Sequence, residues 1–487
     1  MSTDDIGGRA LRGMGWVAAE KWGVRLVSLA VFAVLTRTVA HEAFGLLSLT
    51  TVFIAILMVF VDSGFAKSLV QKPEIDNRDT STAFWTSLGI AALIYVVLFF
   101  AAPLIAAAYA EPTLTPVLRV MGLGLFVNAA SGVPAALLER NMDFRVLSLR
   151  SISGTMAGAA ISIPLALSGA GVWALVAQTL GTLVASAIAL WLSSEWRPQL
   201  LFSVSSLRAM ISFGMSILGL ELMNAVQANV DKLLIGTFLG SGPLGIYFIA
   251  QRLLNIITEL MTTVIGKLAL TTFSRLQSEP SRLRRAFLQM TFGSAAVAVP
   301  VFAAVALLAE IIVPYVFGPN TMPSVPVMQV LAISAAFASI VYFDKNTLLA
   351  VGQAPRAFTL GLIENVVGVV LLLLCLPYGL LVVAIGRAAR LFVVWPWRLW
   401  LLHRHVGIDI RRYLSIVIIA VSSIVPSVLV YLLLEKTAWR MTEPAFWTFA
   451  VPVGIIIVTI YALTLAGIAR EDERAFLKSV LRRIRKK

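Results

Sequence analysis

Long apolar segments recur along the whole chain, and they constrain its fold more than any other feature. A helix needs about 20 apolar residues to cross a bilayer, and fourteen stretches meet or approach that length. Only 13% of the 487 residues are charged, against roughly 25% in a soluble globular domain. The sequence therefore predicts an all-α polytopic membrane protein with about 14 transmembrane helices. These lie at approximately 14–38, 43–66, 83–109, 115–138, 148–168, 171–193, 209–236, 243–268, 287–309, 326–349, 357–377, 379–402, 413–434 and 445–468.

Lysines and arginines are divided unevenly between the connections on the two sides of this predicted bundle. One set of connections, with the tail after Ile468, holds most of them, including Lys67, Arg150, Lys345 and Arg398. The other set holds only Arg37, Lys232, Lys436 and Arg440. Because basic loops stay in the cytoplasm, we expect both termini there. The net charge of +14 is then assigned to surfaces facing anionic lipid, and no nucleic-acid partner is expected.

An internal repeat relates the two halves of the chain. Residues 44–47 (Phe-Gly-Leu-Leu) align with residues 244–247 (Leu-Gly-Ile-Tyr) at an offset of 200, and Lys67 aligns with Lys267. Six predicted spans separate the equivalents, so the halves have the same orientation, as in transporters with parallel repeats. We predict lobes at 1–200 and 201–410, two appended spans within 411–469, and a basic amphipathic tail at 470–487 on the inner leaflet.

Residues 210–270 form the most informative stretch. They read as two apolar helices joined by a Gly/Pro turn at Gly240–Gly245, and each helix carries a polar stripe at helical spacing. Lipid does not tolerate such stripes, so both faces are expected to line a bundle interior or a cavity. The residues predicted to line the cavity, or to couple transport to an ion, are Glu221, Asn224, Gln227, Asn255 and Glu259.

Four arginines fall near mid-membrane by their distance from the predicted helix ends. They are Arg25, Arg252, Arg387 and Arg390. With Glu221 they make five such charges, and at about 2.5–3.5 kcal/mol each their insertion costs on the order of 15 kcal/mol before pairing. The guanidinium fork matches phosphate oxygens and is weakly hydrated. The excess of cations predicts an anionic substrate bound by these four arginines.

Structural roles for the same residues remain open from sequence alone. Arg252 and Glu259 can pair along one helix, and Arg387 with Arg390 can snorkel to the interface or bind lipid phosphates. Glu364 and Asn365 line the cavity or bond to a neighbouring helix. Asp231 and Lys232 are expected at the exterior end of their helix, as a cap and a solvated charge. Trp395, Trp397 and Trp400 are expected to form an interfacial aromatic belt.

Motifs for enzymatic chemistry are missing from the sequence. Cys375 is the only cysteine, and three histidines are scattered, so neither a disulfide nor a metal site is expected. No phosphate-binding glycine loop, nucleophile elbow or zinc-protease motif occurs. We expect a protein that is not an enzyme and has no cofactor.

Five short stretches occur in order along residues 10–410. They are FVDSGFAKSLVQ (60–71), ALLERNMDFRVLSLR (136–150), GAGVWALVAQTLGT (169–182), VDKLLIGTFLGSGPLGIYFIAQRLL (230–254) and AVGQAPRAF (350–358). At this spacing the chain resembles Wzx-type polysaccharide exporters of the multidrug/oligosaccharidyl-lipid/polysaccharide flippase superfamily, nearest to the colanic-acid and succinoglycan type. The resemblance implies two rocking six-helix lobes that move an undecaprenyl-pyrophosphate-linked oligosaccharide to the periplasmic leaflet. It thereby implies that the chain lies in the bacterial cytoplasmic (inner) membrane. It also implies cavity arginines for the pyrophosphate, of which Arg25 carries over.

The predicted function is therefore a flippase for a polyprenyl-pyrophosphate-linked oligosaccharide in surface polysaccharide biosynthesis, with membrane lipids around it. A polysaccharide polymerase and its co-polymerase are the expected partner proteins. One alternative is a cation-coupled multidrug exporter of the same fold, which calls for acidic residues dominating the cavity of the first lobe. Another is a membrane glycan polymerase or ligase, which needs a larger exterior loop than this chain offers. A non-transporting scaffold has no use for mid-membrane arginines.

Overall fold

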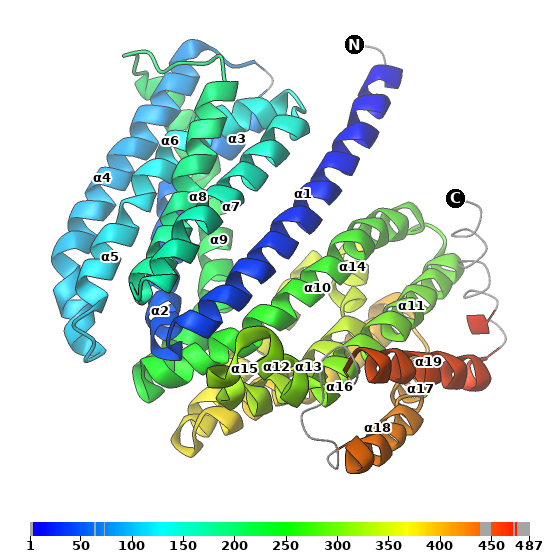
Figure 1. Cartoon of the computed structure of the whole chain (residues 1–487). Helices are drawn as coiled ribbons and strands as arrows, with labels where there is room; N and C mark the ends of the chain where they lie inside the picture. The colour runs from blue at the N-terminus through cyan, green and yellow to red at the C-terminus, as the bar shows by residue number, and fades with distance from the viewer. Residues whose placement is uncertain (1–2, 63–64, 73, 439–449, 471–472, 475–487) are drawn as a thin grey trace. The chain divides into compact units, whose positions relative to one another are not determined.

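The computed structural model describes residues 3–62, 65–72, 74–438, 450–470 and 473–474, and most of them lie in helices (Figure 1). These residues form nineteen α-helices and two short 3-10 helices, and none of them lies in a β-strand. The predicted all-α fold class is therefore confirmed. The predicted amphipathic tail at 470–487 lies almost entirely outside the described residues.

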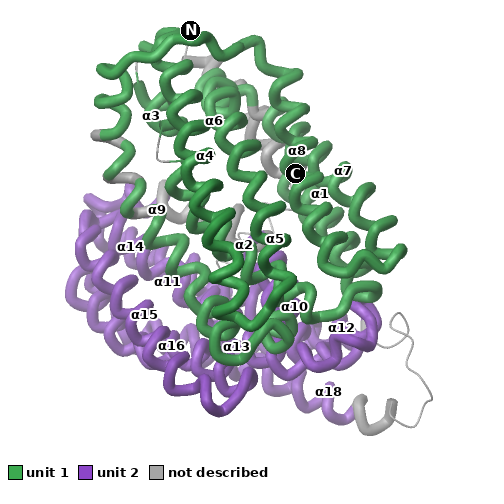
Figure 2. The backbone as a smooth tube through the Cα atoms, turned by 90° about the vertical axis from the view of Figure 1, so that its left-hand side faces the viewer, with its two compact units in different colours: residues 1–248 green, residues 249–487 purple. Residues whose placement is uncertain are grey.

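Contacts divide the chain into two compact units, residues 1–248 (unit 1) and 249–487 (unit 2), shown in Figure 2. The boundary between the units falls within α10 (Ser241–Arg275), so α9 (Val204–Leu239) belongs to the first compact unit. The division into lobes at residues 200 and 201 stays a prediction.

Unit 1 contains nine whole helices and the start of α10, all among its described residues. Gly154 and Gly158 on one helix lie directly against Thr182 and Ser186 on the next, and such small residues let two backbones approach closely. The helices of unit 1 before α9 are α1 (Thr3–Thr38), α2 (His41–Asp62), α3 (Phe65–Gln71), α4 (Asn77–Ala108), α5 (Leu114–Gly122), α6 (Gly124–Arg140), α7 (Phe144–Leu167) and α8 (Val172–Ser193).

Unit 2 is organised around a large buried apolar cluster with stacked aromatic rings. The rings of Phe287 and Tyr413 stack with centroids 5.7 Å apart, and Phe337 stacks on Phe392 at 4.3 Å. Its helices after α10 are α11 (Pro280–Leu307), α12 (Ala309–Phe317), η1 (Pro319–Ser324), α13 (Val325–Ile340), α14 (Phe343–Ala350), α15 (Ala354–Cys375), η2 (Leu376–Tyr378), α16 (Leu380–Val406), α17 (Ile410–Ser422), α18 (Val425–Ala438) and α19 (Ala450–Ile468).

The fourteen predicted apolar segments fall on helices within the described residues, which do not include 63–64 and 445–449. Eleven helical stretches in the described part of the chain are long and apolar enough to cross a membrane. The other three segments fall on α1, α9 and α10, which have 36, 36 and 35 residues. Some of the predicted spans are divided into two helices, for example at Leu123, at residues 341–342 and at residues 423–424. The number of crossings and the position of the termini stay predictions.

The turn between α9 and α10 is tighter than the sequence suggested. The predicted Gly/Pro turn at Gly240–Gly245 reduces to Gly240 alone, with α9 ending at Leu239 and α10 beginning at Ser241. Gly240 has φ of +86°, a conformation that favours glycine. Pro243 instead lies in the first turn of α10, where backbone N–H groups have no partner within the helix and a proline is tolerated.

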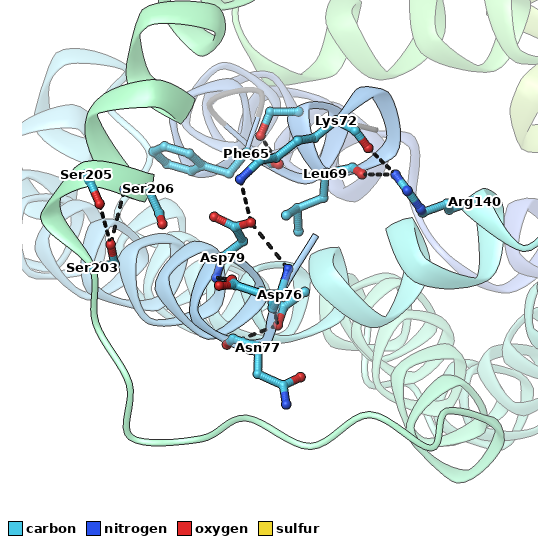
Figure 3. Close-up of polar contacts among 12 residues, drawn as sticks. Phe65, Leu69, Lys72, Asp76, Asn77, Asp79, Arg140, Ser203, Ser205 and Ser206 are labelled. Atoms are coloured by element: carbon cyan, nitrogen blue, oxygen red, sulfur yellow. Dashed lines mark hydrogen bonds and ion pairs between the residues drawn. The ribbon is translucent and has the colours of Figure 1, made fainter. Parts of the chain in front are cut away.

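A polar cluster at one end of unit 1 fixes the short helix α3 (Figure 3). Arg140, the last residue of α6, donates to the carbonyl oxygens of Leu69, at 3.2 Å, and Lys72. The Lys72 ammonium lies 2.5 Å from the carboxylate of Asp79, which also forms a reciprocal capping box with Asp76 at the start of α4. The connection from α2 to α4 is therefore held to two neighbouring helices.

Candidate functional site

Unit 1 contains a cavity of about 360 Å³ lined by α2, α3, α6, α7 and α9. Small and apolar side chains form much of its wall. The polar groups lining it are Asp62, Lys67, Asn128, Ser131, Glu139, Arg150 and Glu221. Three of these side chains are carboxylates and two are cationic, so the lining has one net negative charge. Its other residues are mainly small or apolar.

Local packing explains why α3 contributes to this cavity. Phe65 and Leu69 are buried and pack into an apolar cluster that includes Phe84 and Val133. They occupy one face of the short helix, because residues four apart lie on the same side. The remaining face carries the lining residues Ala66, Lys67 and Val70, so the burial of Phe65 and Leu69 directs Lys67 towards the cavity.

One ion pair lies in the cavity wall. The Lys67 ammonium is 2.6 Å from the Glu221 carboxylate, and the two side chains are 58% and 46% exposed. An exposed pair contributes only about 0–1 kcal/mol to stability, because water competes for both charges. The pair connects α3 to α9 and remains accessible to any molecule in the cavity.

Arg150 has a different environment. Its Nε atom is buried and has no hydrogen-bond partner among the residues that the structure describes. Two residues earlier on α7, the Ser148 hydroxyl donates to the Glu20 carboxylate at 3.0 Å, which ties α7 to α1. A buried donor without an acceptor costs about 1–3 kcal/mol. The cavity lining therefore includes a cationic side chain whose Nε atom is closed off from solvent.

The predicted site residues of the first half are dispersed over two helices. Glu221 lines the cavity, whereas Arg25, Asn224 and Gln227 are not among its lining residues. Arg25 is half-buried on α1, Gln227 is half-buried on α9, and Asn224 is exposed.

The predicted site residues of the second half lie on α10 and α16 in unit 2. Arg252 is half-buried, whereas Asn255 and Glu259 are exposed. Arg387 and Arg390 are both half-buried. Arg390 packs against Gly368 of α15, where an added Cβ would lie 2.6 Å from the arginine Cδ. Roles for these residues in binding stay proposals.

Unit 2 also contains a buried ionic network, and it resolves the alternative left open for Glu364. Glu364 is 5% exposed, pairs with Arg398 of α16 and lies 2.6 Å from the Lys345 ammonium. Arg398 also reaches Asp344 at 3.4 Å, and the hydroxyl of Tyr413 donates to the same carboxylate at 3.3 Å. Glu364 therefore bonds to neighbouring helices α14 and α16.

Three placements expected from sequence are corrected by this packing. Arg398 and Lys345 were assigned to basic connections, but Arg398 is buried and both belong to the network around Glu364. Trp395 was assigned to an aromatic belt, but it packs edge-on against Phe337, with ring centroids 5.0 Å apart. Trp397 and Trp400 are 42% and 47% exposed.

Asp231 was also misplaced. It was expected as a cap at the end of its helix, yet α9 continues to Leu239 and Asp231 is fully buried. The hydroxyl of Tyr247 donates to its carboxylate at 2.6 Å. The sequence did not reveal this partner because it comes from the next helix, after the turn.

Sequence reasoning missed four of the charged residues in the cavity. Asp62 and Glu139 were not assigned to a site, and Lys67 and Arg150 were counted only as basic residues of connections. A usable signal was present, because all four occur in the stretches at 60–71 and 136–150, two of those that support the resemblance. No group of three or more potential metal ligands occurs within the described part of the chain.

Comparison with known proteins gives a consistent set of relatives. A profile of the family described as polysaccharide biosynthesis protein matches residues 34–326, more than half of the chain. The teichuronic acid biosynthesis protein TuaB of Bacillus subtilis is 25% identical over 417 residues, covering 83% of this chain and 84% of TuaB. The succinoglycan biosynthesis transport protein ExoT of Rhizobium meliloti is 25% identical, covering 73% and 72%. The lipopolysaccharide biosynthesis protein WzxC of Escherichia coli is 24% identical, covering 72% of each chain.

Solved structures of transporters share the fold. The lipid II flippase MurJ, in an inward closed conformation, superimposes with a TM-score of 0.73 at 14% identity, covering 92% of this chain and 98% of MurJ. An inward-facing multidrug resistance transporter of the MATE family gives a TM-score of 0.61 at 15% identity, covering 80% and 98%. At such identities the likeness concerns the fold alone.

Proposed function

The chain belongs to the polysaccharide biosynthesis protein family, and from this premise we propose that it is a flippase for a polyprenyl-pyrophosphate-linked oligosaccharide. The lipid-linked saccharide would enter from the cytoplasmic leaflet and leave in the periplasmic leaflet. A charged and hydroxyl-rich head group cannot cross hydrocarbon unaided, whereas a polar cavity between helices removes that barrier. The polyprenyl tail can remain in lipid throughout.

The observation that carries this proposal is the polar cavity of unit 1. It places five ionisable side chains within a bundle whose outer surface is apolar. Ionisable side chains that line a cavity among such helices usually mark a substrate or ion pathway. The relatives support the assignment, since their names include a succinoglycan transport protein and a lipopolysaccharide biosynthesis protein.

Binding of the pyrophosphate is assigned to the predicted arginines, because guanidinium groups form paired hydrogen bonds with phosphate oxygens. In this proposal the arginines that bind the pyrophosphate are Arg25, which belongs to unit 1, and Arg252, Arg387 and Arg390, which belong to unit 2. Alternating access would then expose the site first to one side of the membrane and then to the other. The sequence holds no ATP-binding loop, so the driving force would be the membrane potential or an ion gradient.

Leaflet transfer in proteoliposomes tests the proposal. A fluorescently labelled undecaprenyl-pyrophosphate oligosaccharide would be placed in both leaflets, and a membrane-impermeant quencher would report its movement. We expect transfer by the wild type and loss of transfer in the double variant Arg387→Ala, Arg390→Ala at unchanged abundance. No transfer by the wild type with several unrelated lipid-linked glycans would refute the flippase assignment.

One observation favours a second candidate, a cation-coupled multidrug exporter. Carboxylates outnumber cationic groups in the cavity of unit 1, which suits a cationic drug better than an anion. The same proteoliposomes distinguish the two functions. Efflux of a cationic dye against a proton or sodium gradient, without movement of the lipid-linked saccharide, would identify the exporter.

A further inference from the structure

We propose that the cavity of unit 1 binds the sugar residues of the transported saccharide, while the pyrophosphate is held elsewhere, and that it disfavours acidic sugars. This inference rests on the proposed function and specifies which part of the substrate the cavity recognises. It concerns Asp62, Glu139 and Arg150 of the cavity lining. None of these three residues belongs to the proposed pyrophosphate site.

Charge argues against a phosphate in this cavity. Asp62 and Glu139 add two carboxylates to the lining, and the Lys67 ammonium is already neutralised by Glu221 at 2.6 Å. A pyrophosphate carries hydrogen-bond acceptors and negative charge, so it would face carboxylates that offer it no donor. Like charges at close range repel one another. Arg150 alone does not offset that repulsion.

Hydroxyl groups fit the same lining, because each hydroxyl both donates and accepts a hydrogen bond. The carboxylates of Asp62 and Glu139 accept from hydroxyls, and the guanidinium of Arg150 is a donor to them. Asn128 offers a donor and an acceptor. A mixed set of donors and acceptors therefore matches a polyol.

The size and walls of the cavity agree with this ligand. Its volume of about 360 Å³ lies at the lower end of the roughly 300–1,000 Å³ typical of small-molecule sites, which suits a small part of a saccharide. Gly132 and Ala135 on α6 leave a smooth apolar surface beside the polar groups. Sugar rings have an apolar face and a polar rim, so they complement a wall of this kind.

The single cysteine of the chain makes a direct test possible. Cys375→Ser removes it, and Ala135→Cys places a reporter in the cavity wall without removing a polar group. Reaction of this reporter with a maleimide is then measured in detergent-purified, full-length protein. The competing probes are undecaprenyl pyrophosphate without sugar, the same lipid carrying glucose, the same lipid carrying glucuronate, and free maltotriose.

We expect the glucosyl lipid to protect the reporter at about tenfold lower concentration than the bare or glucuronyl lipid. This factor corresponds to ~1.4 kcal/mol, the order of one hydrogen bond to a charged group. Glu139→Gln should bring the glucuronyl lipid close to the glucosyl lipid, because the repelling charge is gone. Glu195→Gln, an exposed site outside the cavity lining, should change nothing. Asp62→Asn provides a second variant if Glu139→Gln does not fold.

Three results would overturn the inference. They are equal protection by the bare and glucosyl lipids, protection by none of the probes, and unchanged discrimination in both carboxylate variants. Failure of the proposed function looks different: free maltotriose then protects as well as the glucosyl lipid, and the wild type moves no lipid between leaflets. That result would support a saccharide site in the cavity and reject a lipid-linked saccharide as the substrate.

Discussion

Gly45 on α2 and Gly245 on α10 pack against each other in a reciprocal arrangement. A Cβ atom on Gly45 would overlap the carbonyl oxygen of Ser241, and one on Gly245 would overlap that of His41. Both pairs of equivalent residues are separated by 200 positions, the offset of the internal repeat. Gly45 contacts Ser241 in the same way that their equivalents, Gly245 and His41, contact each other. Such a reciprocal contact is typical of residues beside a local two-fold axis.

Gly45→Ala tests whether this close crossing is needed. The added methyl group would meet backbone atoms, which cannot move aside as a flexible side chain can. We expect a loss of about 1–3 kcal/mol in the free energy of unfolding, as for other overpacked sites, measured by thermal denaturation in detergent. Gly89→Ala on α4 is the control, since nothing lies within 4 Å of its added Cβ. Equal stability of the two variants would show that the helices separate without penalty.

Reversal of the charges at Lys67 and Glu221 tests the ion pair in the cavity wall. Lys67→Glu should lower leaflet transfer at least tenfold, because a fourth carboxylate enters the cavity, while stability changes by less than about 1 kcal/mol. The double variant Lys67→Glu, Glu221→Lys should recover part of the transfer.

Arg282→Glu is the matched control for this reversal, because Arg282 forms an exposed ion pair with Glu279 at 2.9 Å. Its transfer rate should equal that of the wild type. Normal transfer by Lys67→Glu would mean that the pair and its surroundings play no part in transport.

Arg398→Met tests the buried network of unit 2. The change leaves the fully buried carboxylate of Asp344 without its cationic partner on α16, and breaking such a pair costs about 3–5 kcal/mol. The unfolding temperature should fall accordingly, and Asp344→Asn in the same chain should restore part of it. Arg404→Met, at an exposed position near the end of the same helix, should change stability by no more than about 0.5 kcal/mol. A similar small effect at both positions would contradict the network's contribution.

Arg390→Ala should abolish leaflet transfer at normal abundance, and Arg390→Lys should restore only part of it, because an ammonium lacks the paired donors of a guanidinium. Gly368→Ala should also reduce transfer. Its added methyl carbon would lie only 2.6 Å from the Cδ atom of Arg390, so the arginine side chain would have to move. Gly361→Ala on the same helix is the control, because its nearest neighbour lies at 3.6 Å. Full transfer by both Arg390 variants would remove this residue from the proposed pyrophosphate site.

The fold was largely predictable because membrane helices are encoded locally. Each apolar segment falls on one or two helices where the chain is described, and Gly45 and Gly245, which the offset of 200 residues aligns, lie in contact. Breaks within spans, such as the one at Leu123 between α5 and α6, were not predicted, since the apolar composition continues across them.

The candidate site was less predictable because it depends on which helices are neighbours. Depth along a helix was estimated from sequence, but depth does not identify the helix that a charge faces. The sequence alone therefore suggests a cap for Asp231, whereas the structure pairs it with Tyr247. It likewise suggests a loop charge for Arg398, whereas the structure pairs it with Glu364. Glu221 was singled out by its polar stripe, whereas Arg150 followed two other arginines near a connection and was grouped with them.

The buried network of unit 2 has a consequence for biosynthesis. Asp344 and Lys345 lie on α14, Glu364 on α15 and Arg398 on α16, and each ion pair of the network joins two of these three helices. Alone in hydrocarbon, each charge costs about 2.5–3.5 kcal/mol. When the ribosome has completed α15, Lys345 can already meet Glu364, but Asp344 must wait for Arg398. The three helices therefore gain most by leaving the translocon as one group, with α16 completing a set that α14 begins.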